Sequence, residues 1–246
     1  MLALSLILAA LIGLSLGLLG SGGSIITLPV LVYVARVPIQ EAVSMSLLIV
    51  GATSALGSLI NLQRGDMDLR AGIFFGVSGI VGALIGSKFT HLVSAQMLLL
   101  CFGALMLVVG VRMLLVHQVS PPGRQCKPFR CLATGVVVGI LTGFLGVGGG
   151  FVILPALVLF AGLDMKAAVG TSLAVIAVNS FAGLVGQLQY VQFEWGLTLE
   201  FFVAAAIGML GGLMLANRIS SRSLHRFFAW SIMALGTFLL LKNLIS

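Results

Sequence analysis

The chain has 246 residues, of which 60% are hydrophobic and 8% are charged, and its formal charge is +7. Ordinary soluble domains carry about 25% charged residues, so this chain lacks the polar side chains that cover a soluble surface, and lipid is the solvent such a surface requires. The basic residues stand in short connections between apolar runs, which indicates orientation in a membrane rather than binding to nucleic acid.

The first segment, residues 1–35, contains no charged residue and is interrupted by the glycine-rich stretch GSGG at 20–23, with a proline at position 29. A membrane-spanning helix needs about 20 apolar residues, so this segment is too long for one crossing and short for two. It lacks the basic start of a signal peptide. We therefore predict two helical pieces joined by a glycine turn.

Three segments of spanning length follow, at 42–62, 71–89 and 94–115, and a basic, proline-containing linker occupies 119–130. The second half then has the same plan. Residues 131–163 form a long uncharged segment broken by GVGGG at 146–150, and segments of spanning length follow at 167–188, 199–217 and 224–243. We predict two transmembrane units, 1–118 and 131–246, on either side of the linker.

The two halves also match residue by residue at one separation. GLSLGLLGSGGSIITLP at 13–29 matches GILTGFLGVGGGFVILP at 139–155, a separation of 139 − 13 = 126 residues that also pairs Ser46 with Ser172 and Asn61 with Gln187. Internal repeats of this kind are typical of secondary transporters. The predicted fold is an all-α polytopic membrane protein built from two sequence repeats.

The basic residues predict how these repeats are oriented. If each long segment crosses the membrane once, the 13 Lys and Arg residues divide seven against six between the two sides. If each is a hairpin, they divide ten against three, and only Arg36, Lys88 and Lys242 remain on the poorer side. The second division fits the excess of basic residues on the cytoplasmic side. It predicts an inverted second repeat and non-cytoplasmic termini.

The second arms of the two hairpins, at 24–35 and 150–161, are short. Twelve residues of helix reach about 18 Å, little more than half of the hydrocarbon core. We therefore predict re-entrant hairpins, whose glycine turns meet near the middle of the membrane.

The glycine turns are the first candidate for chemistry. Successive backbone N–H groups without intervening side chains, followed by a helix N-terminus, can hold an anion without a buried cation. The alternative is that these glycines only allow a tight turn and close packing.

Polar residues on the next helix of each half are the second candidate, because hydroxyl and amide groups can contact the oxygens of an anion. The alternative is that Ser and Thr bond carbonyls of their own helix and that amides join helices. The predicted substrate-binding residues are Gly20, Ser21, Gly22, Gly23, Ser24, Ser46, Asn61, Gly146, Gly148, Gly149, Gly150, Thr171, Ser172, Asn179 and Gln187. We interpret a separate glycine stripe at 72–86 as helix packing.

The sequence lacks the motifs of intramembrane proteolysis and of metal binding. No Asp, Glu, Lys or Arg stands in the middle of a predicted segment, and no HExxH motif, membrane Ser–His pair or membrane aspartate pair occurs. An intramembrane protease is therefore not expected. The three cysteines and three histidines lack the spacing of a metal site, and we expect no cofactor.

The duplicated glycine turn with its following proline, together with GTSL at 170–173 and SMSL at 44–47, resembles the sulfite exporter TauE/SafE family. The resemblance implies a secondary transporter of small sulfur-containing or organic anions, such as sulfite, sulfonates or sulfoacetate, in the bacterial inner membrane. A channel-like anion pore is the alternative. The expected partners are a small anion and membrane lipid, not nucleic acid, and a homo-oligomer stays open. GSGGS in place of GVGGG, and SMS in place of GTS, suggest unequal half-sites.

Overall fold

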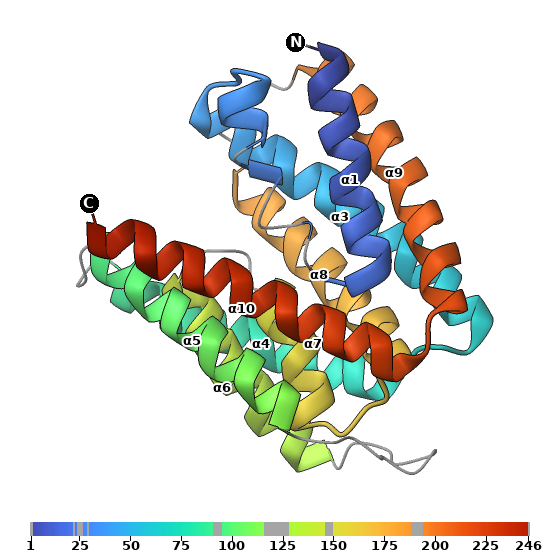
Figure 1. Cartoon of the computed structure of the whole chain (residues 1–246), viewed down its shortest axis with the longest axis vertical. Helices are drawn as coiled ribbons and strands as arrows, with labels where there is room; N and C mark the ends of the chain where they lie inside the picture. The colour runs from blue at the N-terminus through green and yellow to red at the C-terminus, as the bar shows by residue number, and fades with distance from the viewer. Residues whose placement is uncertain are drawn as a thin grey trace.

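The computed structural model describes residues 2–21, 23, 27–28, 30–90, 95–115, 128–145, 150–187 and 194–245. All regular elements in these ranges are helices (Figure 1). They are α1 (Leu2–Leu19), the short π-helical turn η1 (Val30–Val34), α3 (Ile39–Arg64), α4 (Leu69–Thr90), α5 (Ala95–Leu115), α6 (Pro128–Leu145), α7 (Gly150–Leu159), α8 (Met165–Gln187), α9 (Trp195–Arg218) and α10 (Ser221–Ile245).

The helices confirm the segments predicted from hydropathy. All six segments of spanning length fall within α3, α4, α5, α8, α9 and α10, apart from residues 94 and 188, which lie outside the described ranges. Over the described residues, three stretches are both long and apolar enough to cross a membrane, namely Glu41–Arg64, Met165–Leu184 and Trp195–Arg218. The second arm of the second long segment ends at Leu159, two residues earlier than predicted.

The outer surface of the helices is apolar. On α4, Ile73, Val77 and Val81 recur every fourth residue and are 62%, 59% and 50% exposed. A stripe of this kind would be unfavourable in water, and hydrocarbon is its natural surrounding. The fold is therefore that of a protein that spans a membrane several times.

Helix boundaries recur at the separation found in the sequence. The four pairs that begin 126 residues apart are α1 and α6 (Leu2, Pro128), α3 and α8 (Ile39, Met165), α4 and α9 (Leu69, Trp195), and α5 and α10 (Ala95, Ser221). The two halves thus place corresponding helices at corresponding positions.

Close glycine contacts join α1 to α9 and α4 to α6, so the first helix of each half packs on a helix of the other half. At each contact, a Cβ added to the glycine would collide with a backbone carbonyl oxygen of the facing helix. The contacts are Gly13 with Ala205, Gly208 with Ala10, Gly139 with Gly79, and Gly82 with Val136. The last two are the first two shifted by 126 residues. Part of the glycine stripe predicted to serve packing, Gly79 and Gly82, does so.

Helices α3 and α8 run antiparallel along the middle of the molecule. A Cβ on Gly57 would lie 2.9 Å from Cδ1 of Leu173, and one on Gly183 would lie 3.5 Å from Cδ1 of Leu47. The residue numbers therefore fall on α8 as they rise on α3. Helices α5 and α10 also lie side by side in opposite directions (Figure 1). The helices of these two corresponding pairs thus run in opposite directions.

The second arms of the two long segments end in the same cap. In each arm one N–H bonds a carbonyl five residues back and another bonds a carbonyl six residues back: Ala35 to Val30 (3.0 Å) and Val37 to Leu31 (3.0 Å), then Ala161 to Ala156 (3.3 Å) and Leu163 to Leu157 (3.1 Å). This pattern requires a left-handed residue, which is Arg36 with φ 59° in the first arm and Gly162 with φ 72° in the second.

Candidate substrate site

The first glycine turn begins directly after α1. Gly20 has a φ of 66°, a left-handed conformation that glycine adopts without strain. Its N–H bonds the carbonyl of Leu16 at 2.7 Å, so this N–H belongs to the end of α1 and does not face a ligand. A Cβ on Gly23 would lie 2.5 Å from the carbonyl oxygen of Ile12, which places Gly23 beside α1 again. Gly20 and Gly23 thus both lie against α1.

This turn rests on helix α8 of the other half. The hydroxyl of Ser172 is 3.1 Å from the carbonyl oxygen of Gly20 and 2.9 Å from that of Val169, and it donates to either. A Cβ on Gly20 would lie 2.6 Å from this hydroxyl and 3.0 Å from Cα of Val169. Ser172 is the eighth of the 23 residues of α8. The tip of the first turn therefore lies about a third of the way along α8.

The residues just before Ser172 hold the connection between α3 and α4. The hydroxyl oxygen of Thr171 accepts the backbone N–H of Asp68 at 3.0 Å. A Cβ on Gly170 would lie 2.8 Å from Cβ of Asn61 and would collide with the carbonyl oxygen of Asp66. The GTS stretch at 170–172 thus contacts both Gly20 and the connection between α3 and α4. The Thr171 hydroxyl oxygen is already used by the N–H of Asp68.

Several polar groups of α3 bond within their own helix, as the alternative interpretation expects. The amide of Asn61 donates to the carbonyl of Gly57 at 2.8 Å, and the hydroxyl of Thr53 donates to the carbonyl of Ile49. Ser46 is buried on the same helix. These bonds reduce the groups available to a ligand but do not use all of them.

Two buried polar atoms on α3 and α8 have no hydrogen-bond partner among the described residues. They are Oγ of Ser54, whose residue is fully buried, and Oδ1 of Asn179, whose residue is partly exposed. A buried polar atom without a partner costs about 1–3 kcal/mol, so such atoms need an explanation. Sequence reasoning did not include Ser54 in the site, although its equivalence to Ser180 by the 126-residue separation was a signal.

Asn179 lies on the same face of α8 as Ser172. The seven residues between them span two helical turns and about 10.5 Å. Because Ser172 faces Gly20, Asn179 lies further along α8 on the face that bears this contact. This face therefore carries one hydroxyl bonded to the turn and one amide with an unused oxygen.

Other predicted site residues lie outside the described residues. They are Gly22, Ser24, Gly146, Gly148 and Gly149. Gly150 is the first residue of α7, and Gln187 is the last residue of α8, with a side chain outside the described part. Ser21 is buried, and its hydroxyl is 3.4 Å from the carbonyl oxygen of Leu19.

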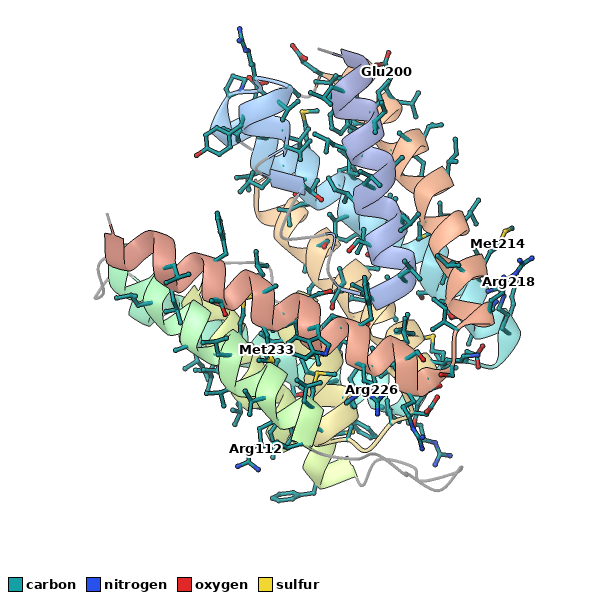
Figure 2. The ribbon with its side chains drawn as sticks, in the orientation of Figure 1. Arg112, Glu200, Met214, Arg218, Arg226 and Met233 are labelled. Carbon is teal, nitrogen blue, oxygen red and sulfur yellow. The ribbon has the colours of Figure 1, made fainter. Side chains whose placement is uncertain are left out.

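Charged side chains gather at the ends of the helices. Arg112, Arg218 and Arg226 lie toward the end of the molecule opposite the two termini, whereas Glu200 lies near the N-terminus (Figures 1 and 2). The hydroxyl of Ser221 donates to Asp164 at 3.0 Å, which joins the start of α10 to the connection between α7 and α8 at that same end. The described site is thus electrically neutral and surrounded by helices.

Known proteins are similar to this chain over most of its length. A model described as "Sulfite exporter TauE/SafE" matches residues 5–239. A probable membrane transporter protein of Xylella fastidiosa (strain 9a5c) is 33% identical over 244 residues, which cover 95% of this chain and 92% of that protein. The probable membrane transporter protein YunE of Bacillus subtilis is 23% identical over 99% of this chain and 100% of its own length. MJ0441 of Methanocaldococcus jannaschii, also a probable membrane transporter protein, is 25% identical over 98% and 96%. No solved structure matches the chain.

Proposed function

We propose, from the premise that this chain belongs to the sulfite exporter TauE/SafE family, that it is a secondary transporter of small sulfur-containing or organic anions. Sulfite, sulfonates and sulfoacetate represent the substrate class, and the bacterial inner membrane is the proposed location. The observation that carries the proposal is the neutral face of α8, where the first glycine turn is bonded to Ser172 and the amide of Asn179 has an unused oxygen.

We further propose that the two halves are inverted repeats with re-entrant hairpins and non-cytoplasmic termini. The antiparallel packing of α3 on α8 and of α5 on α10 supports this, because inverted repeats are related by an axis in the membrane plane. The arginines at the end opposite the termini support a cytoplasmic position for that end. The disulfide bond of Cys131, next to the linker, weighs against it, because disulfides are rare in the cytosol.

Cysteine labelling from each side of the membrane tests this topology in a variant that lacks the three native cysteines. Gln63→Cys and Ser223→Cys should react from the cytoplasmic side, and Gly196→Cys should react from the other side. Labelling of Gln63→Cys and Ser223→Cys from opposite sides would contradict the inverted arrangement.

In the proposed site the substrate lies between the two hairpins and α8. Backbone N–H groups at 22–24 and 146–150, including the N-terminus of α7 at Gly150, would supply partial positive charge. A half-turn of the Asn179 amide about its Cβ–Cγ bond exchanges the positions of its oxygen and its NH₂ group. The NH₂ group can therefore face an anion's oxygen. Gly20 and Ser172 would shape the site, since Gly20 has no free N–H. Without a buried cation, binding stays weak enough for release.

Reconstituted vesicles test the function. The purified protein should take up labelled sulfite or a small sulfonate with a rate that saturates as the concentration rises. Vesicles preloaded with unlabelled substrate should show counterflow, which requires a site that alternates between the two sides. Saturable uptake without counterflow would point to a channel-like pore, and uptake equal to that of empty vesicles for every anion tested would refute the proposal.

A further inference from the structure

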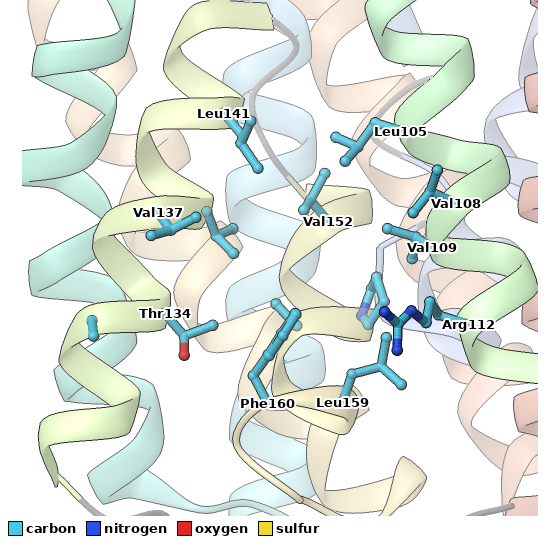
Figure 3. Close-up of a pocket in the computed structure, with 14 residues that line it drawn as sticks. Leu105, Val108, Val109, Arg112, Thr134, Val137, Leu141, Val152, Leu159 and Phe160 are labelled. Carbon is cyan, nitrogen blue, oxygen red and sulfur yellow. The ribbon is translucent and has the colours of Figure 1, made fainter. Parts of the chain in front are cut away.

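A second feature of the structure lies away from the proposed substrate site. A cavity of about 590 Å³ opens between α5, α6 and α7 (Figure 3). Its volume lies within the range of about 300–1,000 Å³ typical of small-molecule sites. Arg112 and Thr134 are its two polar side chains, and the remaining lining residues are aliphatic, apart from Phe160. The cavity therefore suits a ligand that is mostly hydrocarbon.

The polarity of the cavity changes along its length. Arg112 and Thr134 lie at one end with Leu159 and Phe160, and Leu105 and Leu141 lie at the other (Figure 3). The polar end is close to the linker, because Arg112 is near the end of α5 and Thr134 is near the start of α6. One end of the cavity thus lies near the membrane surface and the other lies deeper.

Arg112 has no partner among the Asp and Glu side chains. All six of them are in the described residues, and none forms an ion pair with this exposed guanidinium. An arginine at the end of a membrane helix extends its charge toward the interface while its stem packs on apolar groups. Its planar group of N–H donors matches a phosphate. The guanidinium of Arg112 at the polar end of the cavity is therefore suited to bind an anionic group.

We propose that this cavity binds an anionic membrane phospholipid, with one acyl chain among α5, α6 and α7 and the phosphate at Arg112. Basic pockets between helices near the membrane surface are suited to anionic headgroups. The mouth is formed by side chains that face lipid, since Val108, Val137 and Phe160 are 60%, 56% and 62% exposed. A small oxyanion offers no apolar surface to such a lining. The proposal goes beyond the transport function and does not depend on it.

Native mass spectrometry of the purified protein with phosphatidylglycerol or zwitterionic phosphatidylcholine tests the proposal. Wild type should retain phosphatidylglycerol in preference to phosphatidylcholine. Arg112→Gln should weaken retention about fivefold, the factor that corresponds to one basic residue near an anionic surface. Ala133→Phe should weaken it by filling the cavity, because Ala133 is in the lining.

Two matched variants serve as controls. Arg218→Gln removes an exposed arginine at the end of α9, and Ala104→Phe adds a ring to an exposed position of α5 outside the lining. Both should retain phosphatidylglycerol as wild type does, and size-exclusion profiles should show that all four variants are folded. Equal retention of the two lipids by wild type, or equal retention by Arg112→Gln and Arg218→Gln, would overturn the proposal. Displacement of the lipid by inorganic phosphate or sulfite alone would show a site for free anions and would also overturn it.

Discussion

Thr53 on α3 and Asn179 on α8 occupy equivalent positions of the two halves, but their side chains behave differently. The Thr53 hydroxyl bonds a carbonyl of its own helix, whereas Oδ1 of Asn179 has no partner among the described residues. The glycine contacts, in contrast, are alike in the two halves. Gly13 and Gly139 meet backbone carbonyls of their facing helices in the same manner. Helix packing is thus common to both halves, and the polar groups differ. We infer that the shared glycine contacts serve the fold, and that the unequal polar pair Thr53 and Asn179 includes a group that can serve binding.

The largest expected effect is at the shared glycine contacts. Gly13→Ala and Gly139→Ala should each lower the free energy of unfolding by about 2 kcal/mol, within the range for overpacking, because the added methyl group forces two helices apart. Thermal unfolding in detergent would measure this effect. Gly76→Ala is the matched control, since nothing lies within 4 Å of the added Cβ, and it should not lower stability. A loss confined to one of the two variants would break the equivalence.

An intermediate effect is expected at the unequal pair. Asn179→Leu should weaken binding of the transported anion about tenfold, or by about 1.4 kcal/mol, because a hydrogen bond to a charged ligand is lost. Its unfolding temperature should not fall through the loss of Oδ1, which has no partner among the described residues.

Thr53→Val, which nearly conserves volume, should leave binding unchanged. Measurements of equilibrium binding and of unfolding on Thr53→Val and Asn179→Leu distinguish a role in binding from a role in the fold. Unchanged affinity in Asn179→Leu would remove this residue from the site. Thr171→Val would be less informative, because it also leaves the N–H of Asp68 without its partner.

The smallest effect is expected at the caps of the second arms. Arg36 holds a left-handed conformation where the other half has Gly162. Arg36→Gly should raise stability by about 0.5–1 kcal/mol, and Gly162→Ala should lower it by a similar amount, because side chains are strained at such angles. Melting temperatures of the two variants should therefore move in opposite directions. A decrease for Arg36→Gly would indicate that its exposed side chain makes a contribution that outweighs the strain.

Much of the fold follows from the sequence alone. Uncharged runs longer than one crossing, with glycines inside them, predicted segments in two helical pieces, and helical elements flank each glycine stretch: α1 and η1 in the first half, α6 and α7 in the second. The predicted segments of spanning length were each found as a helix, with starts one to four residues from the observed ones, and the observed starts recur at the 126-residue separation of the matching sequence. The family was also evident from the duplicated motif.

The contacts between helices could not be predicted. Spacing shows that Ser172 and Asn179 share a face, but it does not show which segment lies opposite that face. The bond from Ser172 to Gly20 crosses 152 positions of sequence. Nor does spacing show which hydroxyl has a partner inside the protein, so Ser54 was not included, whereas Thr171, which accepts the N–H of Asp68, was. Such outcomes depend on local backbone position and on neighbours that only the folded chain brings together.

Because the first helix of each half packs on a helix of the other half, the order of synthesis limits when the first half can pack. Helix α1 packs on α9, which begins 195 − 2 = 193 residues later in the chain. At about 5–20 residues per second, α9 is synthesised about 10 to 40 seconds after α1. During that interval the glycine face of α1 has no partner from its own chain. The first half therefore cannot complete its packing until α9 of the second half has been synthesised.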